Sequence, residues 1–297
     1  MPPFDLRPSR PADAEAVLAL WNRSAPHDPL APALLAEKLA DTEAVLVATV
    51  AGDLVGLGTG ALWPTPGQVR GSVRLLAVDP AHRRRGVGTA LLAEIEARLG
   101  AAGAEAVRLA ECAPNYLTPG VDVRYDGGLA FATARGYTDL GEAVNLGVDL
   151  RADDWDTSAD EARLGAEGVT VRRATEADRP ALARLLAATW PTWQAETDRA
   201  YLRAPVSMHL ALRDGDVLGF AAHDTNNVGT GWFGPMGTAE AARGLGIGGV
   251  LCRRCLADSR AQGLDRATIA WAAALPFYKR VAGADVERRF RRFEKAL

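Results

Sequence analysis

Apolar and polar residues follow an order along this chain that occurs twice. In the first copy, residues 4–7 predict a short strand, and two amphipathic helices follow it. The apolar, β-branched runs 44–50 and 54–62 meet at Ala51-Gly52-Asp53, which predicts a hairpin. A strand at 72–78 leads into a helix whose apolar residues recur at every fourth position, Val87, Leu91, Ile95 and Leu99.

The same order restarts after residue 167. Residues 169–172 match residues 4–7, and Gly215-Asp216 joins the two strands of a second predicted hairpin. Residues 151–167 are polar and acidic, so we interpret them as a linker. The sequence therefore predicts two tandem domains, 1–150 and 168–297, each an α/β fold with a mixed sheet of the α+β kind.

Composition narrows the function class. The 297 residues are 48% hydrophobic and 24% charged, and the net charge is −3, which is typical of a soluble globular protein. This balance favours no nucleic-acid or membrane partner, and no run approaches the roughly 20 apolar residues that span a bilayer. Three cysteines build no disulfide framework and no signal-peptide pattern is visible, so we expect a cytoplasmic protein.

Two glycine-rich turns carry the clearest chemical signal. The pattern Arg-x-x-Gly-x-Gly occupies residues 83–88 and returns 160 positions later at 243–248, each time between a strand and a helix. Glycines let backbone N–H groups point into one concavity, and the helix N-terminus adds partial positive charge. Such a turn binds a pyrophosphate. It is neither a Walker loop nor a dinucleotide fingerprint, because the residues and spacing differ.

Further motifs accompany the turns. Leu-Ala-Val-Asp-Pro at 76–80 precedes the first turn, Gly-Pro-Met-Gly at 234–237 precedes the second, and Pro-Phe-Tyr-Lys-Arg at 276–280 lies downstream. Together these motifs resemble the GNAT superfamily of acetyl-CoA-dependent N-acetyltransferases, in a tandem arrangement. The resemblance implies acetyl-CoA as co-substrate, with pantetheine paired to a splayed strand and the pyrophosphate held at the glycine turn.

The resemblance assigns CoA-binding residues in both halves. In the first half they are Leu76, Ala77, Val78, Arg83, Arg84, Arg85, Gly86, Val87, Gly88, Thr89 and Asn115. In the second half they are Met236, Gly237, Thr238, Arg243, Gly244, Leu245, Gly246, Ile247, Gly248 and Gly249. Trp271 stands where the second half would carry the counterpart of Asn115.

Catalysis requires a base for the amine and an acid for the thiolate. The resemblance places the acid at Tyr278, and the corresponding residue of the first half is Ala132. We therefore expect catalysis in the second half, with Tyr125 as an alternative acid in the first and a packing role as the alternative for Tyr278. The candidate bases are Glu111 and Asp224; the alternatives are a solvated Glu at a strand end and an Asp in a turn.

Other residues complete the predicted site. The resemblance implies that the loops with His27-Asp28 and with Trp190 and Trp193 line the acceptor site. The two tryptophans would form an aromatic wall there, or ordinary helix-end packing. Cys252 and Cys255 fall at apolar helix positions, so we interpret them as core residues and expect no metal.

The sequence thus predicts an N-acetyltransferase that moves an acetyl group from acetyl-CoA to a primary amine of a small-molecule acceptor. Two alternatives stay open: an enzyme that uses another acyl-CoA, and a non-catalytic acyl-CoA sensor or partner-binding protein. The two halves would form a monomer as a pseudo-dimer, or the chain would form a homodimer.

Overall fold

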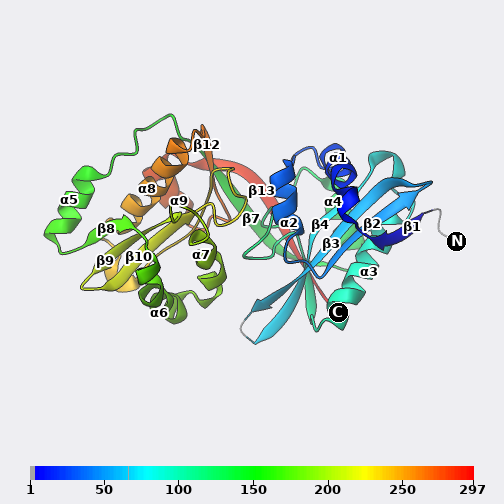
Figure 1. Ribbon diagram of the computed structural model, residues 1–297, viewed down its shortest axis with the longest axis horizontal. Coiled ribbons are helices and arrows are strands. Elements are labelled where there is room, and N and C mark those ends of the chain that lie inside the picture. The colour runs from blue at the N-terminus through cyan, green and yellow to red at the C-terminus, as the bar shows by residue number, and fades with distance from the viewer. Residues whose placement is uncertain (1–3, 66) are drawn as a thin grey trace. The chain divides into compact units, whose positions relative to one another are not determined.

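The computed structural model describes residues 4–65 and 67–297. Its contacts divide the chain into two compact units (Figure 1). The first contains Met1–Ala143 together with Arg289–Leu297, and the second contains Val144–Arg288. Within each unit the strands pair side by side, and helices cover both faces of these strands.

The first unit has the predicted order of elements. Its helices are α1 (Ala14–Ser24), α2 (Pro32–Leu39), α3 (Val87–Ala101) and α4 (Asp126–Ala134), with short 3-10 turns η1 (Pro11–Asp13) and η2 (Pro80–His82). Its strands are β1 (Asp5–Pro8), β2 (Ala44–Val50), β3 (Asp53–Thr65), β4 (Gln68–Val78), β5 (Ala106–Leu109) and β6 (Val121–Asp122), with the start of β7 (Thr138–Asp149) and the end of β13 (Asp285–Ala296).

The sheet of the first unit runs β1-β2-β3-β4-β5-β13, and only β4 and β5 pair in parallel. Helices α1 and α2 cover one face with an apolar cluster around Trp21, and α3 covers the other (Figure 1). Helix α3 lies very close to β3, because a Cβ built on Gly58 would approach Ile95 Cδ1 to 2.6 Å. This close contact fixes the position of the helix that begins at the first glycine turn.

The second unit repeats this plan. Its helices are α5 (Ser158–Ala166), α6 (Arg179–Thr189), α7 (Gln194–Ala200), α8 (Ile247–Ala261) and α9 (Leu275–Ala282), with 3-10 turns η3 (Glu176–Asp178), η4 (Pro191–Trp193) and η5 (Glu240–Ala242). Its strands, in sheet order, are the end of β7, then β12 (Arg266–Ile269), β11 (Trp232–Thr238), β10 (Asp216–His223), β9 (Met208–Arg213) and β8 (Thr170–Arg173). Helix α8 covers one face, and α6 and α7 cover the other (Figure 1).

The mixed α/β fold with two tandem domains is confirmed, but the segment predicted as a linker differs from the prediction. Residues 151–167 contain helix α5, and Trp155 is 3% exposed within the core of the second unit. The acidic residues that made the segment read as a linker bind arginines of α8: Asp153 pairs with Arg253, and Glu161 pairs with Arg254. The segment is therefore part of the second unit.

The C-terminal end of the chain also differs from the predicted domain of 168–297. Residues 285–296 form strand β13, whose last residues pair with β5 and belong to the first unit. Phe290 and Phe293 are both buried on opposite faces of the strand, because they lie three positions apart, while Arg289 and Arg291 bind Glu142 and Asp139. The strand therefore lacks the two-residue alternation by which a half-buried strand is predicted, and its many charged residues conceal it in the sequence.

We predict that Phe293→Ala destabilises the protein by about 3–5 kcal/mol, because it leaves a cavity in the core of the first unit. Val286→Ala is the control: Val286 lies on the same strand but is 38% exposed, so the loss should stay near 0.5 kcal/mol. Denaturant unfolding measures both. Equal losses would contradict the placement of β13 in the core.

Candidate active site

The two glycine turns have the same backbone conformation. Arg84 and Gly86 have φ angles of 63° and 86°, and the corresponding Gly244 and Gly246 have φ angles of 88° and 85°. Gly86 begins α3 and Gly246 begins α8 as the N-cap residues of these helices. Arg84 holds a left-handed conformation that disfavours a side chain, and such strain is often found at binding sites. The sequence pattern thus identified two copies of one turn.

The strand before the first turn separates from its neighbour. Parallel pairing of β4 with β5 ends at Val73. Further along, the N–H of Asp79 donates to a β3 carbonyl at 2.9 Å. Because successive residues of a strand direct their backbone groups to opposite sides, Leu76 and Val78 direct theirs away from β3, to the side where β5 no longer pairs. This edge has the splayed form that the sequence comparison with GNAT proteins implied.

The second unit has a similar opening. Parallel pairing of β11 with β12 ends at Phe233, and the N–H of Ala239 donates to a β10 carbonyl at 2.8 Å. By the same alternation, Met236 and Thr238 direct their backbone groups away from β10. Both units therefore keep the backbone framework of a splayed strand that leads into a glycine turn.

A cleft of about 1000 Å³ opens beside β4 in the first unit. It is bordered by the glycine turn, the end of β5, the loop after α1 and the start of α4. The predicted CoA-binding residues that border it are Leu76, Ala77, Val78, Arg83, Arg84, Gly86, Gly88 and Thr89. Arg85, Val87 and Asn115 do not border it, and Val87 is buried in the core under α3.

The three arginines of the first turn have different surroundings. Arg83 donates from Nε to the carbonyl of Val78 at 3.1 Å and from Nη2 to the carbonyl of Ser24 at 3.0 Å. It therefore ties the loop after α1 to the open strand. Arg84 and Arg85 are exposed, so their guanidinium groups are available to phosphate oxygens.

Asn115 has a structural environment. It is buried, and its amide donates to the carbonyl of Glu37 at 2.7 Å while its oxygen accepts from Lys38 Nζ at 3.0 Å. These hydrogen bonds hold the Asn115 side chain against helix α2, away from the cleft. The predicted contact with CoA does not fit this position.

Glu111 is fully buried and bound between two arginines. Its carboxylate pairs with Arg108 and with Arg292, the latter at 2.7 Å from Arg292 Nε. The carboxylate is held by both arginines and does not border the cleft, so it does not contact a substrate bound there. The predicted role as a base therefore does not fit, and the predicted solvated strand end does not fit either. The sequence could not reveal this, because Arg292 lies 181 residues away along the chain.

A tyrosine and a carboxylate meet at the cleft of the first unit. The Tyr125 hydroxyl donates to Asp28 Oδ2 at 2.8 Å and accepts from the N–H of His27 at 3.1 Å. The His27 and Tyr125 rings lie 5.2 Å apart. Tyr125 immediately precedes α4, and all three residues border the cleft. The sequence offered Tyr125 only as an alternative acid and His27-Asp28 only as part of an acceptor loop.

Tyr278 is partly buried and packs against the core of the second unit. It packs edge-on against Phe233 and Phe277, with ring centroids 6.1 and 5.1 Å away. Burial raises the pKa of Tyr278, so the phenol stays protonated. Its hydroxyl bonds to none of the residues that the structure describes. Both predicted roles, acid and packing residue, are compatible with this environment.

Asp224 anchors a loop. It is buried, and its carboxylate accepts from the N–H of Gly229 and from Gln262 Nε2, both at 3.0 Å. Burial alone would raise the pKa of Asp224, but these bonds and the adjacent His223 hold it below its usual value. A low pKa weakens a carboxylate as a base.

Side chains of the second unit cover its own glycine turn and open strand. Arg163 Nη2 donates to the carbonyl of Leu245 at 2.9 Å and would lie 2.7 Å from a Cβ on Gly246. Trp190 lies over Gly237, with a ring atom 2.6 Å from where a Cβ would be. In the first unit the nearest atom to a Cβ on Gly86 is 4.0 Å away. The first turn is therefore open and the second is covered.

The tryptophan pair and the cysteine pair of the second unit are both part of its hydrophobic packing. Trp190 and Trp193 stack with centroids 5.2 Å apart and both contact Phe220 edge-on. Cys252 and Cys255 are buried as predicted, and burial raises the pKa of Cys252 to about 12. Within residues 4–65 and 67–297, no group of His, Cys, Asp or Glu is arranged to hold a metal ion. None of the helices described there is long and apolar enough to cross a membrane.

The sequence profile of the acetyltransferase (GNAT) family matches residues 14–119 and again residues 177–284. The chain belongs to the GNAT family. The two matches correspond to the two units, and the family transfers acyl groups from acyl-CoA to amines. Among curated proteins, no sequence matches this chain.

Solved structures with the same fold include tandem GNAT proteins. A GCN5-related glucosamine N-acetyltransferase region of a fungal multi-domain GH3 β-N-acetylglucosaminidase has a TM-score of 0.86 at 21% identity over 98% of this chain, which spans 38% of that chain. A GNAT protein from Sphaerobacter thermophilus has a TM-score of 0.71 at 19% identity over 99% of this chain and 95% of its own. A tandem GNAT protein of the clavulanic acid biosynthesis pathway has a TM-score of 0.67 at 17% identity, covering 99% and 98%.

We predict that Glu111→Gln lowers the free energy of unfolding by about 3 kcal/mol, because it removes the charge of a fully buried carboxylate that pairs with two half-buried arginines, Arg108 and Arg292. Asp149→Asn is the matched control: its ion pair with Arg151 is exposed, so the loss should stay below about 1 kcal/mol. Chemical denaturation of both variants gives the comparison. A stable Glu111→Gln protein with greatly reduced turnover would instead support Glu111 as the base.

Proposed function

We propose that this GNAT protein transfers an acetyl group from acetyl-CoA to the primary amine of a small molecule, and that the reaction takes place in the first unit. The observation that carries this proposal is the cleft that joins an open glycine turn, the open edge of β4 and the Tyr125–Asp28 pair. The proposal moves catalysis from the second half, where the sequence favoured it, to the first.

The cleft of the first unit suits CoA. A pyrophosphate at the turn would accept from the backbone N–H groups that begin α3, with Arg84 and Arg85 adding charge. The open edge at Leu76 and Val78 offers backbone groups to the amides of pantetheine. The nearest atom to the position that a Cβ on Gly86 would occupy is 4.0 Å away, so the turn is accessible to phosphate oxygens.

The Tyr125–Asp28 pair supplies both proton transfers. Asp28 takes a proton from the ammonium of the acceptor, and the free amine attacks the thioester carbonyl. The attacking nitrogen, now positively charged, releases its surplus proton to water. Backbone N–H groups of the open strand stabilise the oxyanion. When the C–S bond breaks, Tyr125 gives its proton to the CoA thiolate, and the proton on Asp28 returns to Tyr125 along their 2.8 Å hydrogen bond. The pair is thus restored at the end of each turnover.

We predict that Tyr125→Phe lowers kcat about 10²- to 10⁴-fold, because the leaving thiolate loses its proton donor. Tyr278→Phe, the matched change in the second unit, should alter kcat less than about twofold. CoA release from acetyl-CoA over a panel of small amines measures both. The panel includes glucosamine, since one structural neighbour is named for its acetylation.

The same assay separates the possible failures. No amine-dependent CoA release by the wild-type protein would support the non-catalytic alternative. Release that depends on Tyr278 and not on Tyr125 would return catalysis to the second unit. Faster turnover with a longer acyl-CoA than with acetyl-CoA would correct the donor.

We also predict that Gly86→Glu weakens acetyl-CoA binding more than about tenfold, whereas Gly246→Glu changes it less than about twofold. A glutamate at Gly86 adds negative charge and strain at a φ of 86°, and the same strain exists at Gly246, where φ is 85°. The pair therefore separates the loss of a ligand from a general backbone effect. Calorimetry of the wild-type protein should give one bound acetyl-CoA per chain. Two binding sites per chain, or an equal loss of affinity in Gly86→Glu and Gly246→Glu, would contradict a covered second turn.

A further inference from the structure

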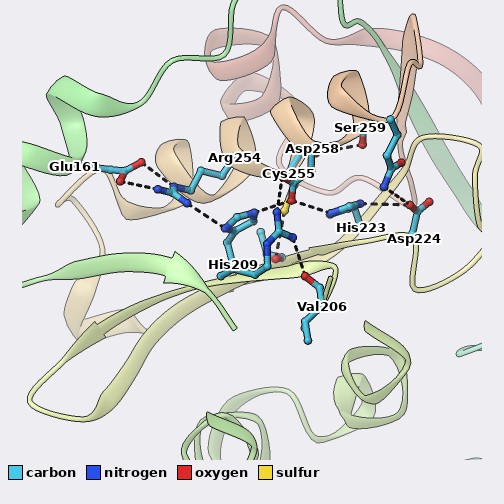
Figure 2. Close-up of polar contacts among 12 residues, drawn as sticks. Glu161, Val206, His209, His223, Asp224, Arg254, Cys255, Asp258 and Ser259 are labelled. Carbon is cyan, nitrogen blue, oxygen red and sulfur yellow. Dashed lines mark hydrogen bonds and ion pairs between the residues drawn. The ribbon is translucent and has the colours of Figure 1, made fainter. Parts of the chain in front are cut away.

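Two buried histidines share one carboxylate oxygen in the second unit (Figure 2). His209 on β9 is 3% exposed and His223 on β10 is 2% exposed. Their Nε2 atoms lie 2.7 and 3.1 Å from the same oxygen, Oδ2 of Asp258 on α8. The three side chains therefore link the helix to both strands beneath it.

Arginines surround this group on two sides. Arg173 of β8 donates to Asp258 Oδ1 at 2.7 Å. Arg254 of α8 binds Glu161 of α5 at 2.7 and 2.8 Å, and its Nη1 lies 3.4 Å from Nδ1 of His209. A guanidinium only donates hydrogen bonds, so this Nδ1 accepts and the proton of His209 is on Nε2. His209 is therefore neutral.

His223 has a carboxylate at each ring nitrogen. Its Nε2 faces Asp258, and its Nδ1 lies 3.5 Å from Asp224 Oδ2 (Figure 2). Two carboxylates favour a proton on both nitrogens, so His223 is an imidazolium. The remaining titratable neighbours, Cys252 and Cys255 of α8, have thiols whose pKa burial raises, and they stay neutral.

The charges of this His–Asp–His cluster balance only when one of the two imidazoles is protonated, and the hydrogen bonds place that charge on His223. The cations are Arg173, Arg254 and His223, and the anions are Glu161, Asp224 and Asp258. Protonation of His209 leaves one uncompensated positive charge in the interior, and loss of the proton from His223 leaves one uncompensated negative charge. Either change is costly because buried charges need partners.

The first unit serves as an internal control for this cluster. Its hairpin and glycine turn place Leu46 and Gly60 where the second unit has His209 and His223, and Ile95 where it has Cys255. That layer is apolar, and a Cβ on Gly60 would lie only 2.8 Å from Ile95 Cγ2. The smaller Cys255 leaves room for an imidazole. The fold therefore forms without such a cluster, and the second unit has it in addition.

We propose that the His–Asp–His cluster is a pH-sensitive device that holds α8 on its sheet only while one of the two imidazoles carries a charge. Helix α8 begins at the second glycine turn, so the device controls the packing of that turn. The proposal does not depend on which unit performs catalysis.

The direction of the pH effect follows from the two histidines. Burial lowers the pKa of His209 despite its bond to Asp258, whereas the bonds to Asp224 and Asp258 overcome burial and raise the pKa of His223. An unfolded histidine has a pKa of about 6.5. The stability that neutral His209 contributes to the folded state is lost as pH falls below this value, and the stability that charged His223 contributes is lost as pH rises above it. Stability of the second unit therefore peaks near pH 6.5. The carboxylates add their own loss below about pH 4.

Imidazole ¹H–¹⁵N spectra of the full wild-type chain test the protonation states directly. At pH 6.5 we expect one buried imidazole as the neutral Nε2–H tautomer and one as the imidazolium. On titration, the first should gain a proton only below, and the second lose one only above, the unfolded value of about 6.5. Two buried imidazoles that both titrate near pH 6.5 would overturn the proposal.

Amide hydrogen exchange, corrected for the intrinsic rate, tests the consequence for α8. Protection of α8 should be greatest near pH 6.5 and fall about tenfold by pH 5 and by pH 8. Protection of α3, which packs on the apolar layer of the first unit, is the internal reference. An α8 profile that matches the α3 profile would overturn the proposal.

Variants assign the two arms of the profile. His209→Leu introduces leucine, the residue that the first unit has at this position. This variant should abolish the loss of α8 protection between pH 6.5 and 5. His223→Gln should abolish the loss of α8 protection between pH 6.5 and 8. His82→Gln, which changes a histidine of the first unit, should leave the α8 profile unchanged. Persistence of the acid arm in His209→Leu would overturn the proposal, and if a variant does not fold, the wild-type spectra decide.

Discussion

The separation of a parallel strand pair in the middle of a sheet is the constraint on which this structure depends. Beyond Val73 and Phe233, the strands β4 and β11 have backbone groups that no neighbouring strand pairs. Such groups need partners, because an unsatisfied buried amide or carbonyl is costly. The first unit gives one carbonyl, that of Val78, to Arg83 and leaves the rest bordering a cleft. The second unit covers its opening with its own side chains.

The two units thus have the same fold with different side chains at equivalent places. Both keep the left-handed steps of the glycine turn, since glycine at Gly86 and Gly246 adopts them without strain. They differ in what lies over the turn and in the layer under the following helix. Arg163 covers the second turn, and a polar cluster around Asp258 replaces an apolar layer. These differences support a substrate site in one unit and a structural or regulatory role for the other.

Local sequence patterns were enough to predict the order of elements and the place of both turns. Hydrophobic periodicity identifies a helix or a strand within about ten residues, and a glycine with positive φ is written in the sequence itself. The same reasoning missed α5 and β13, whose charged residues resemble a linker and a tail. Their polarity reflects ion pairs with partners far along the chain, such as Asp153 with Arg253 and Glu142 with Arg289.

The sequence by itself determined the family, the duplication and the chemistry to expect at a glycine turn, because these depend on residues close together in the chain. Only the tertiary structure decided which turn is open, that Glu111 is neutralised by Arg292, and that Tyr125 meets Asp28 across 97 positions. Burial and ion pairing depend on residues brought together by folding, and no local pattern records them. For that reason the tyrosine in the expected place, Tyr278, packs partly buried against a core, and the one offered as an alternative borders the cleft.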